Sequence, residues 1–287
     1  MKRKIFIGVL VFVALILGAL AAWPAMQRAQ WEKEKMANLP EPPPGYRWVA
    51  IPELSDEFDS DGLDAAKWLD YHPYWGGREP SQHDPANVSV HDSLLHLTST
   101  TDIDDISEVA VPAQDVWVRA ACVTSREPIA FYGYYEARMK ASAISMTSAF
   151  WFQGKYSEID VVEQLGAPKD IPSRSRWMLM NTHYYPDGWE HDRKTPESWQ
   201  MPSGAADDYH IYGVWWKDEN TIWFYHNGQK VKEVQTGAPF DEPMYLFFDT
   251  EVFVWEGLPD VASLKDPARN TMMVDWVRGW RLVAEDR

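Results

Sequence analysis

The chain has 287 residues, of which 45% are hydrophobic, so it can form a substantial core and is not expected to be disordered. Its formal net charge of −16, with acids spread along the chain, argues against a nucleic-acid partner, which would need a basic stripe. Cys122 is the single cysteine, which excludes an intrachain disulfide and a metal site built from cysteines alone.

The N-terminal segment has the pattern of an export signal. Basic residues 2–4 precede an apolar run over residues 5–22, and a basic flank before an apolar stretch is typical of exported proteins. The 18 residues of this run are also just enough to span a bilayer. We therefore expect residues 1–22 to be either a cleaved signal peptide or a retained membrane anchor, with residues 5–22 as the tether. In both cases the rest of the protein would be secreted, periplasmic or membrane-anchored facing outward.

A polar and proline-rich linker is expected over residues 23–45. Four of its last six residues, 40–45, are proline. Proline lacks a backbone N–H, so this stretch cannot be a helix or a central strand and should act as a semi-rigid spacer. The folded domain is therefore expected over residues 46–287.

Short strand patterns follow one another along this domain. Residues 91–98 alternate, with Leu95 and Leu97 on one face. Asn227-Gly228 is the strongest short hairpin signal in the chain. Long amphipathic helical patterns and repeats are absent from the sequence, so these strands predict an all-β sandwich or barrel. The expected strands are residues 91–98, 131–139, 209–216, 221–226, 229–234, 244–248 and 272–282.

Glu158, Asp160 and Glu163 lie within one strand-like segment, residues 157–164. Because side chains alternate along a strand, Glu158 and Asp160 would point to one face and Glu163 to the other. A β-bulge at the pair of valines that follows Asp160 would insert one extra residue and bring all three acids to one face. The two longer glutamates could then lean toward each other over the shorter aspartate.

Carboxylates in this arrangement suit the hydrolysis of a glycosidic bond. Retaining glycosidases hold their two carboxyl groups roughly 5–5.5 Å apart, and repulsion between adjacent carboxylates leaves a protonated acid beside an ionised nucleophile. The alternative is a solvated acidic edge strand, but the aliphatic residues between the acids demand burial. The chain also has 16 Trp, more than one core needs, and flat aromatic faces stack on sugar rings.

Residues 158–163 resemble the bulged active-site signature of glycoside hydrolase family 16, and the similarity extends well beyond them. The other segments are similar to the strand before the family's active site, to the floor of its cleft and to its last strands. The similarity covers roughly residues 51–282 and is greatest to the β-agarase, β-porphyranase and κ-carrageenase branch, with the laminarinase branch as an alternative. These other segments are residues 131–142, 148–152, 249–251, 255–259 and 274–278.

This resemblance implies an all-β jelly-roll sandwich of two antiparallel sheets with a concave substrate cleft. It implies endo-acting hydrolysis with retention, in which Glu158 is the nucleophile and Glu163 the general acid/base. Asp160 would hydrogen-bond the nucleophile and help to set its charge. The implied substrate is a red-algal galactan of the agarose or porphyran type, and no cofactor is required.

Further residues are expected to contact the substrate. The resemblance implies that Trp75 stacks on a sugar, that Arg78 binds a polar or sulfated substituent, and that His183 faces the cleft from the neighbouring strand. An ordinary hydrogen-bonded surface histidine is the alternative for His183. Glu251 lies among apolar residues and needs a partner, which a sugar hydroxyl or an arginine could supply. The remaining expected substrate contacts are Trp151 and Trp255.

A catalytic metal is not expected, because no pair of histidines has a metal-ligand spacing. The resemblance does imply the option of a structural calcium ion on the convex face. Glu57 and Asp275 are the candidate ligands, and the alternative is that each is an ordinary surface acid.

Two other functions remain open at the level of the sequence. Transglycosylation would use the same acids, with a sugar in place of water as the attacking group. A carbohydrate-binding protein that has lost its chemistry is a further alternative, but a pure binder has no need of a cluster of like charges. We expect a monomer whose partner is a polysaccharide.

Overall fold

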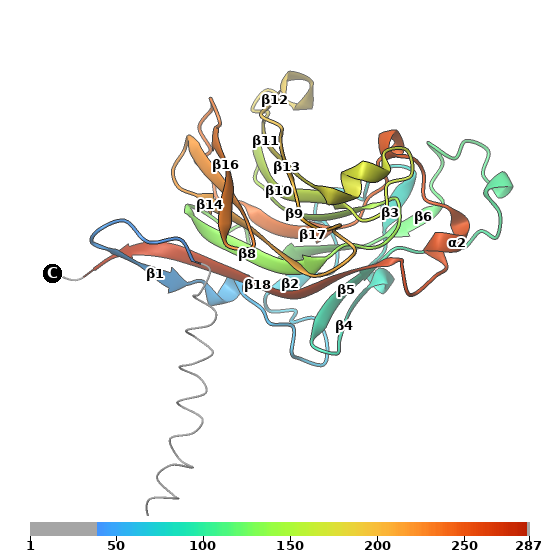
Figure 1. Cartoon of the computed structure of the whole chain (residues 1–287), viewed down its shortest axis with the longest axis horizontal. Helices are drawn as coiled ribbons and strands as arrows, with labels where there is room; N and C mark the ends of the chain where they lie inside the picture. The colour runs from blue at the N-terminus through green and yellow to red at the C-terminus, as the bar shows by residue number, and fades with distance from the viewer. Residues whose placement is uncertain (1–38, 286–287) are drawn as a thin grey trace, which may run out of the picture. The chain divides into compact units, whose positions relative to one another are not determined.

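Two antiparallel β-sheets stacked face to face form the folded part of the chain (Figure 1). The computed structural model describes residues 39–285. Both sheets belong to one compact unit that begins at Pro42. The expected signal or anchor, residues 1–22, and most of the expected linker, residues 23–45, lie outside the described residues.

The first sheet forms one layer of this unit, and all of its pairings are antiparallel. Its strand β18 is the longest and pairs with three others. In order across the sheet the strands are β16 (Gln229–Gln235), β15 (Thr221–His226), β14 (His210–Trp216), β8 (Gly133–Lys140), β18 (Thr271–Ala284), β5 (Leu94–Thr98) and β4 (Val88–His91), with β1 (Tyr46–Ala50) paired to β18.

The second sheet, here called the cleft sheet, is also antiparallel. Its strands in order are β12 (Arg193–Lys194), β11 (Trp177–Tyr184), β10 (Ser157–Leu165), β9 (Thr147–Gln153), β17 (Tyr245–Asp249), β7 (Cys122–Ser125) and β2 (Trp68–Leu69), with β13 (Glu197–Gln200) paired to β11. A separate parallel pair joins β3 (Ser81–His83) to β6 (Val118–Ala120).

Helical segments in the described range are short. The longest is a single 3₁₀ stretch of five residues, η4. No helix within residues 39–285 has both the length and the apolar character needed to cross a membrane. The segments are η1 (Pro52–Leu54), η2 (Pro85–Asn87), η3 (Ile106–Glu108), η4 (Pro172–Arg176), η5 (Trp189–His191), η6 (Val254–Glu256) and α2 (Val261–Leu264).

The core lies between the sheets and is built largely from alternate residues of their longer strands. In β5, Leu95 and Leu97 are fully buried while the residues beside them are partly exposed, as the alternation predicts. The cleft sheet contributes Phe150 and Phe152 of β9, and Phe150 stacks on Phe248 with ring centroids 5.1 Å apart. Full burial of one such side chain stabilises the fold by about 1.5–3 kcal/mol, so this layer holds the sandwich together.

The hairpin signal at Asn227-Gly228 is confirmed, since both residues have positive φ, 48° and 77°, and join β15 to β16. The prediction of one continuous strand over residues 91–98 was wrong. Asp92 and Ser93 have φ of 54° and 56° and form a turn between β4 and β5. Short polar side chains tolerate this left-handed backbone, so the alternating pattern runs through a tight hairpin.

The turn between β9 and β10 is held by the buried carboxylate of Glu242. This carboxylate accepts hydrogen bonds from the backbone N–H groups of Lys155 at 2.9 Å and Tyr156 at 2.8 Å, and from the hydroxyl of Ser157 at 2.7 Å. Gly154 leaves room for it, because a Cβ there would lie 2.5 Å from the carboxyl carbon. The clamp fixes the first residue of β10 and thereby the strand that follows.

We predict that Glu242→Ala lowers the free energy of unfolding by about 2–4 kcal/mol, because the buried Ser157 hydroxyl and two partly buried backbone N–H groups lose their acceptor. Glu242→Gln keeps one acceptor oxygen and should lose less. Urea denaturation followed by tryptophan fluorescence measures both. Glu233→Ala removes only an exposed ion pair with Lys230 and should change stability by less than about 1 kcal/mol. Equal losses for Glu242→Ala and Glu233→Ala would contradict the clamp.

Candidate active site

Strand β10 departs from regular alternation at one point. Its pairing with β9 shifts by one residue between Asp160 and Val162. Val161 and Val162 are both fully buried, whereas one of two successive residues in a regular strand would face outward. The bulge expected from the sequence is therefore confirmed. It places Glu163 on the same face as the two acids before it, in one cleft.

This cleft has a volume of about 1120 Å³ and is lined by β9, β10, β11 and β17 together with the loops around them. Three large aromatic side chains stand exposed along it: Tyr74 is 76% exposed, and Trp189 and Trp255 are each 54% exposed. Exposed aromatic faces beside carboxylates and amides are the surface that a carbohydrate chain requires. The three acids of β10 thus lie where a polymer could contact them.

Glu158 and Glu163 differ in their hydrogen bonds. The Gln153 side-chain amide donates to Glu158 Oε2 at 2.7 Å, whereas the Glu163 carboxyl makes no hydrogen bond to another residue of the described chain. Burial, followed by the charge of Asp160, raises the pKa of both glutamates well above the ordinary value. Because a buried pair of carboxylates cannot easily carry two charges, the arrangement favours one ionised and one protonated group.

His183 lies in the cleft on β11, opposite Glu158 in the strand pairing. Its Nε2 is 3.3 Å from Asp160 Oδ2 and its Nδ1 is 2.7 Å from Asp192 Oδ2. Burial alone would lower the pKa of His183, but the hydrogen bond and charge of Asp160, followed by those of Asp192, raise it to about 9. The imidazole is therefore a cation at neutral pH.

Arg78 and Glu251 form the other ion pair of the cleft. Arg78 Nε donates to Glu251 Oε2 at 2.5 Å, so an arginine is the partner of this buried acid. The guanidinium carbon lies 5.9 Å from the ring centroid of Trp75, 5.4 Å from that of Phe253 and 5.7 Å from that of Trp255. Within the described chain its two terminal nitrogens have no hydrogen-bond partner, which leaves them available to a ligand.

Trp151 forms part of the cleft wall but offers little free surface. It is only 6% exposed, and its ring stacks on Phe247 with centroids 4.3 Å apart. Its indole N–H donates to Asp249 at 3.2 Å. Burial, followed by the charge of Glu251, raises the pKa of Asp249 well above its usual range. Trp151 therefore supports the cleft from beneath more than it presents a stacking face.

Sequence reasoning did not single out Tyr74, Trp189 or Asp192. Gly188, with φ of 93°, marks the turn before Trp189. A glycine in the sequence indicates a turn here, but it does not predict where the loop that follows will lie. Asp192 follows His183 by nine residues. Strand geometry does not predict that two residues at this spacing are in contact. These three residues reach the cleft through tertiary structure.

Glu57 and Asp275 do not fit the calcium site expected from the resemblance. Glu57 accepts hydrogen bonds from Nε and Nη2 of Arg278 at 3.0 and 2.9 Å. Asp275 is paired with Arg138. Because each carboxylate already balances a guanidinium, a divalent cation would meet two positive groups beside its ligands.

One group of potential metal ligands occurs among residues 39–285, namely Glu158, Asp160 and His183, whose ligand atoms lie within 4.8 Å of one another. Both ring nitrogens of His183 face carboxylates, Nε2 that of Asp160 at 3.3 Å and Nδ1 that of Asp192 at 2.7 Å. Ion pairing therefore accounts for this cluster.

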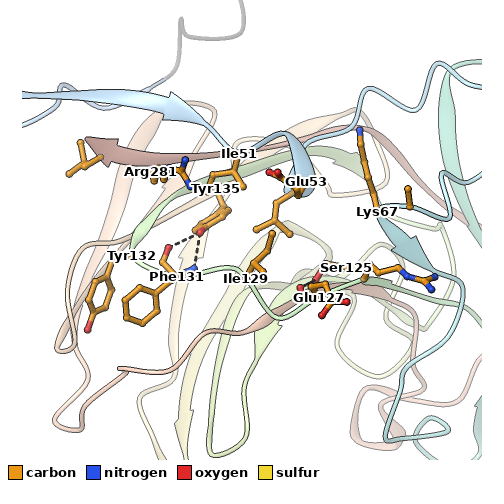
Figure 2. A pocket seen from close by; sticks show the side chains of 14 residues that line it. Ile51, Glu53, Lys67, Ser125, Glu127, Ile129, Phe131, Tyr132, Tyr135 and Arg281 are labelled. Carbon is orange, nitrogen blue, oxygen red and sulfur yellow. Dashed lines mark hydrogen bonds between the residues drawn. The ribbon is translucent and has the colours of Figure 1, made fainter. Parts of the chain in front are cut away.

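A second cavity of about 640 Å³ lies apart from these acids, between η1, the segment after β7 and the end of β18. Figure 2 shows the Tyr135 hydroxyl between the backbone groups of Phe131. This hydroxyl donates to the Phe131 carbonyl at 2.6 Å and accepts from its N–H at 2.9 Å. Glu53 and Glu127 come from separate elements of the cavity wall. The described lining of this cavity therefore has no strand that carries several acids on one face, as β10 does in the cleft.

Comparison with known proteins places this geometry in a family. The sequence matches the family described as beta-porphyranase A-D, GH16 domain, over residues 48–282. It is 33% identical to β-porphyranase B of Phocaeicola plebeius, over 88% of this chain and 90% of that protein. It is 34% identical to β-porphyranase D of Zobellia galactanivorans, over 96% of this chain and 70% of that protein.

The crystal structure of a β-porphyranase from the human gut bacterium Bacteroides plebeius has the same fold. Its TM-score is 0.78 at 32% identity, and the match covers 90% of this chain and 99% of that one. The all-β jelly-roll sandwich implied by the resemblance is thereby confirmed. The chain is a glycoside hydrolase and belongs to the GH16 domain family of β-porphyranases A to D.

Proposed function

We propose that the protein is an endo-acting, retaining glycoside hydrolase that cleaves a β-linked red-algal galactan of the porphyran type. The observation that carries this proposal is the bulged strand, on which Glu158, Asp160 and Glu163 share one face of a cleft. The choice of substrate is supported by the relatives, which are named β-porphyranases and β-agarases. Such a polymer is met outside the cytoplasm, in accord with the export expected from residues 1–22.

In the first step Glu158 is the nucleophile and Glu163 the general acid. The Gln153 amide donates to Glu158 and so favours its ionised form, while Glu163 has no such donor among residues 39–285 and holds its proton. The Glu158 carboxylate forms a bond to the anomeric carbon as the bond to the glycosidic oxygen breaks. Glu163 gives its proton to that oxygen, and one half of the polymer leaves with a new hydroxyl end.

In the second step water releases the glycosyl ester. Glu163, now ionised, takes a proton from the water as its oxygen attacks the anomeric carbon. The ester bond to Glu158 breaks and both glutamates return to their starting protonation states. Two inversions at the same carbon give overall retention of configuration.

Arg78 is the residue on which substrate choice depends. Its two terminal guanidinium nitrogens, which have no hydrogen-bond partner within residues 39–285, match the fork geometry of a sulfate ester or of a hydroxyl pair. Trp75 and Trp255 flank the guanidinium. The net charge of −16 repels a sulfated polymer at long range. Short-range contacts must therefore hold such a substrate, and Arg78 supplies one.

We predict that Glu158→Gln and Glu163→Gln each lower kcat/KM on porphyran by about 10³-fold or more. A galactan oligosaccharide with a nitrophenolate leaving group separates the two roles, because this group needs no proton. Glu163→Gln should release nitrophenol in a rapid burst, whereas Glu158→Gln should release none. Glu233→Gln, an exposed acid outside the cleft, is the control. Near-wild-type turnover by a folded Glu158 variant would refute the assignment.

A pH prediction follows from the raised pKa of both glutamates. Activity requires Glu158 without its proton and Glu163 with its proton, so kcat/KM should follow a bell whose limbs belong to the pair. Burial and the charge of Asp160 oppose a second negative charge on the pair, so the alkaline limb should lie above the range of ordinary carboxyls. Glu163→Gln cannot titrate and should lose the alkaline limb in the residual activity. Persistence of that limb would assign it to another group.

Arg78→Ala should raise KM on porphyran by about ten-fold or more, because a charge-assisted contact with sulfate is lost. Added salt should weaken wild-type binding visibly and the variant less. On neutral agarose the same change should have a modest effect. Arg281→Ala, which removes a cation from the second cavity, controls for the change in net charge. Hydrolysis of laminarin or lichenan without activity on any galactan would refute the assignment of a galactan substrate. It would not affect the catalytic roles of Glu158 and Glu163.

A further inference from the structure

The loop that follows β11 brings a second carboxylate to His183. Asp192 comes directly after η5, and its Oδ2 lies 2.7 Å from His183 Nδ1. Its other oxygen, Oδ1, is buried and has no hydrogen-bond partner among the described residues. A buried oxygen without a partner carries a desolvation cost. The contact between Asp192 and His183 is therefore kept although burial of Asp192 Oδ1 costs folding free energy.

This loop is fixed by backbone hydrogen bonds and an aromatic stack. Gly188 N–H donates to the Tyr185 carbonyl at 3.0 Å, and Asp192 N–H donates to the Trp189 carbonyl at 3.3 Å. The Trp189 ring stacks on Tyr185 with centroids 3.9 Å apart and meets the His183 ring edge-on at 5.7 Å. The position of Asp192 is therefore built into the loop.

We propose that Asp192 is a positioning residue for the hydrolysis: it holds His183 with a proton on both ring nitrogens, so that the imidazolium keeps Asp160 in place between the catalytic glutamates. The inference rests on the proposed function, since it assigns a role within that reaction. Asp192 engages Nδ1 alone, which leaves Nε2 for Asp160 at 3.3 Å. Asn181 Nδ2 lies 2.8 Å from the same Nε2, and Asn181 Oδ1 accepts from the Thr182 N–H at 3.0 Å. A proton on Nε2 requires the amide to rotate so that its oxygen faces this nitrogen.

The charges around His183 favour the cation. On the side away from β10, its strand partner is Lys194 of β12, which is exposed and therefore largely screened by solvent. Burial opposes the charge, yet the acids raise the pKa of His183 to about 9. The acids that face it from β10 and from the loop are Glu158, Asp160, Glu163 and Asp192.

Loss of the Asp192 charge has two consequences. His183 would release its proton at lower pH, because one of the two carboxylates that stabilise the cation is gone. Asp160 would then face a neutral imidazole and lose its charge partner beside Glu158 and Glu163. Within residues 39–285, the Asp192 side chain makes no hydrogen bond to Glu158, Asp160 or Glu163, and it is linked to these acids through its contact with His183.

The test is Asp192→Asn, which keeps the shape of the side chain and removes its charge. NMR titration of ¹⁵N-labelled histidine, with the His183 signal assigned by a His183→Gln variant, reads the pKa of this ring without turnover. We expect the pKa to fall from about 9 by at least about 1 pH unit. At pH 8, kcat on porphyran should fall by about ten-fold with little change in KM. Asp192→Glu keeps the charge and should retain the high pKa and much of kcat.

Glu190→Gln changes another acid of the same loop and should leave both the pKa of His183 and kcat unaltered. An unchanged pKa of His183 in Asp192→Asn would overturn the proposal, and so would a lowered pKa with an unchanged kcat. Failure of the wild-type enzyme to cleave any galactan would instead overturn the proposed function. The titration separates these outcomes because it needs no substrate.

Discussion

Side chains alternate along a β-strand, and β10 departs from that alternation at Val161 alone. Regular pairing would send Glu163 into the core and a valine to the surface, which would bury a carboxylate without a partner. The shift between Asp160 and Val162 avoids both outcomes. The valines fill the core between the sheets, and the acid that follows them returns to the cleft. Both the packing of the sandwich and the spacing of the acids depend on this one inserted residue.

Placing the acids on one face creates a problem of like charge, which two cations relieve only in part. Arg78 is hydrogen-bonded to Glu251, and His183 lies between Asp160 and Asp192. Within the described chain neither cation is hydrogen-bonded to Glu158 or Glu163. Burial and the repulsion from Asp160 therefore raise the pKa of both glutamates. The pair is left with the shared proton that a double displacement needs.

Local patterns in the sequence predicted an all-β sandwich or barrel and a bulge that brings the three acids of β10 to one face. The resemblance to glycoside hydrolase family 16 selected the sandwich. Alternation marks Leu95 and Leu97 as residues of one strand face. In a regular strand Glu163 would point to the face opposite Glu158 and Asp160, so an extra residue is needed to bring it to their side. Contacts between distant segments could not be predicted in this way. Arg78 and Glu251 are 173 residues apart, and Asp192 reaches His183 only through the path of its loop. The turn at Asp92 was missed because alternation continues across a tight hairpin.

The most direct measurement is the site of a trapped glycosyl-enzyme. A galactan oligosaccharide carrying a 2-deoxy-2-fluoro sugar and a good leaving group slows the second step more than the first, so the ester accumulates. Peptide mapping by mass spectrometry should then place the sugar on Glu158, and Glu158→Gln should give no adduct. An adduct on Glu163 or another residue, or wild-type products of inverted configuration with no adduct, would contradict a double displacement by the acids of β10.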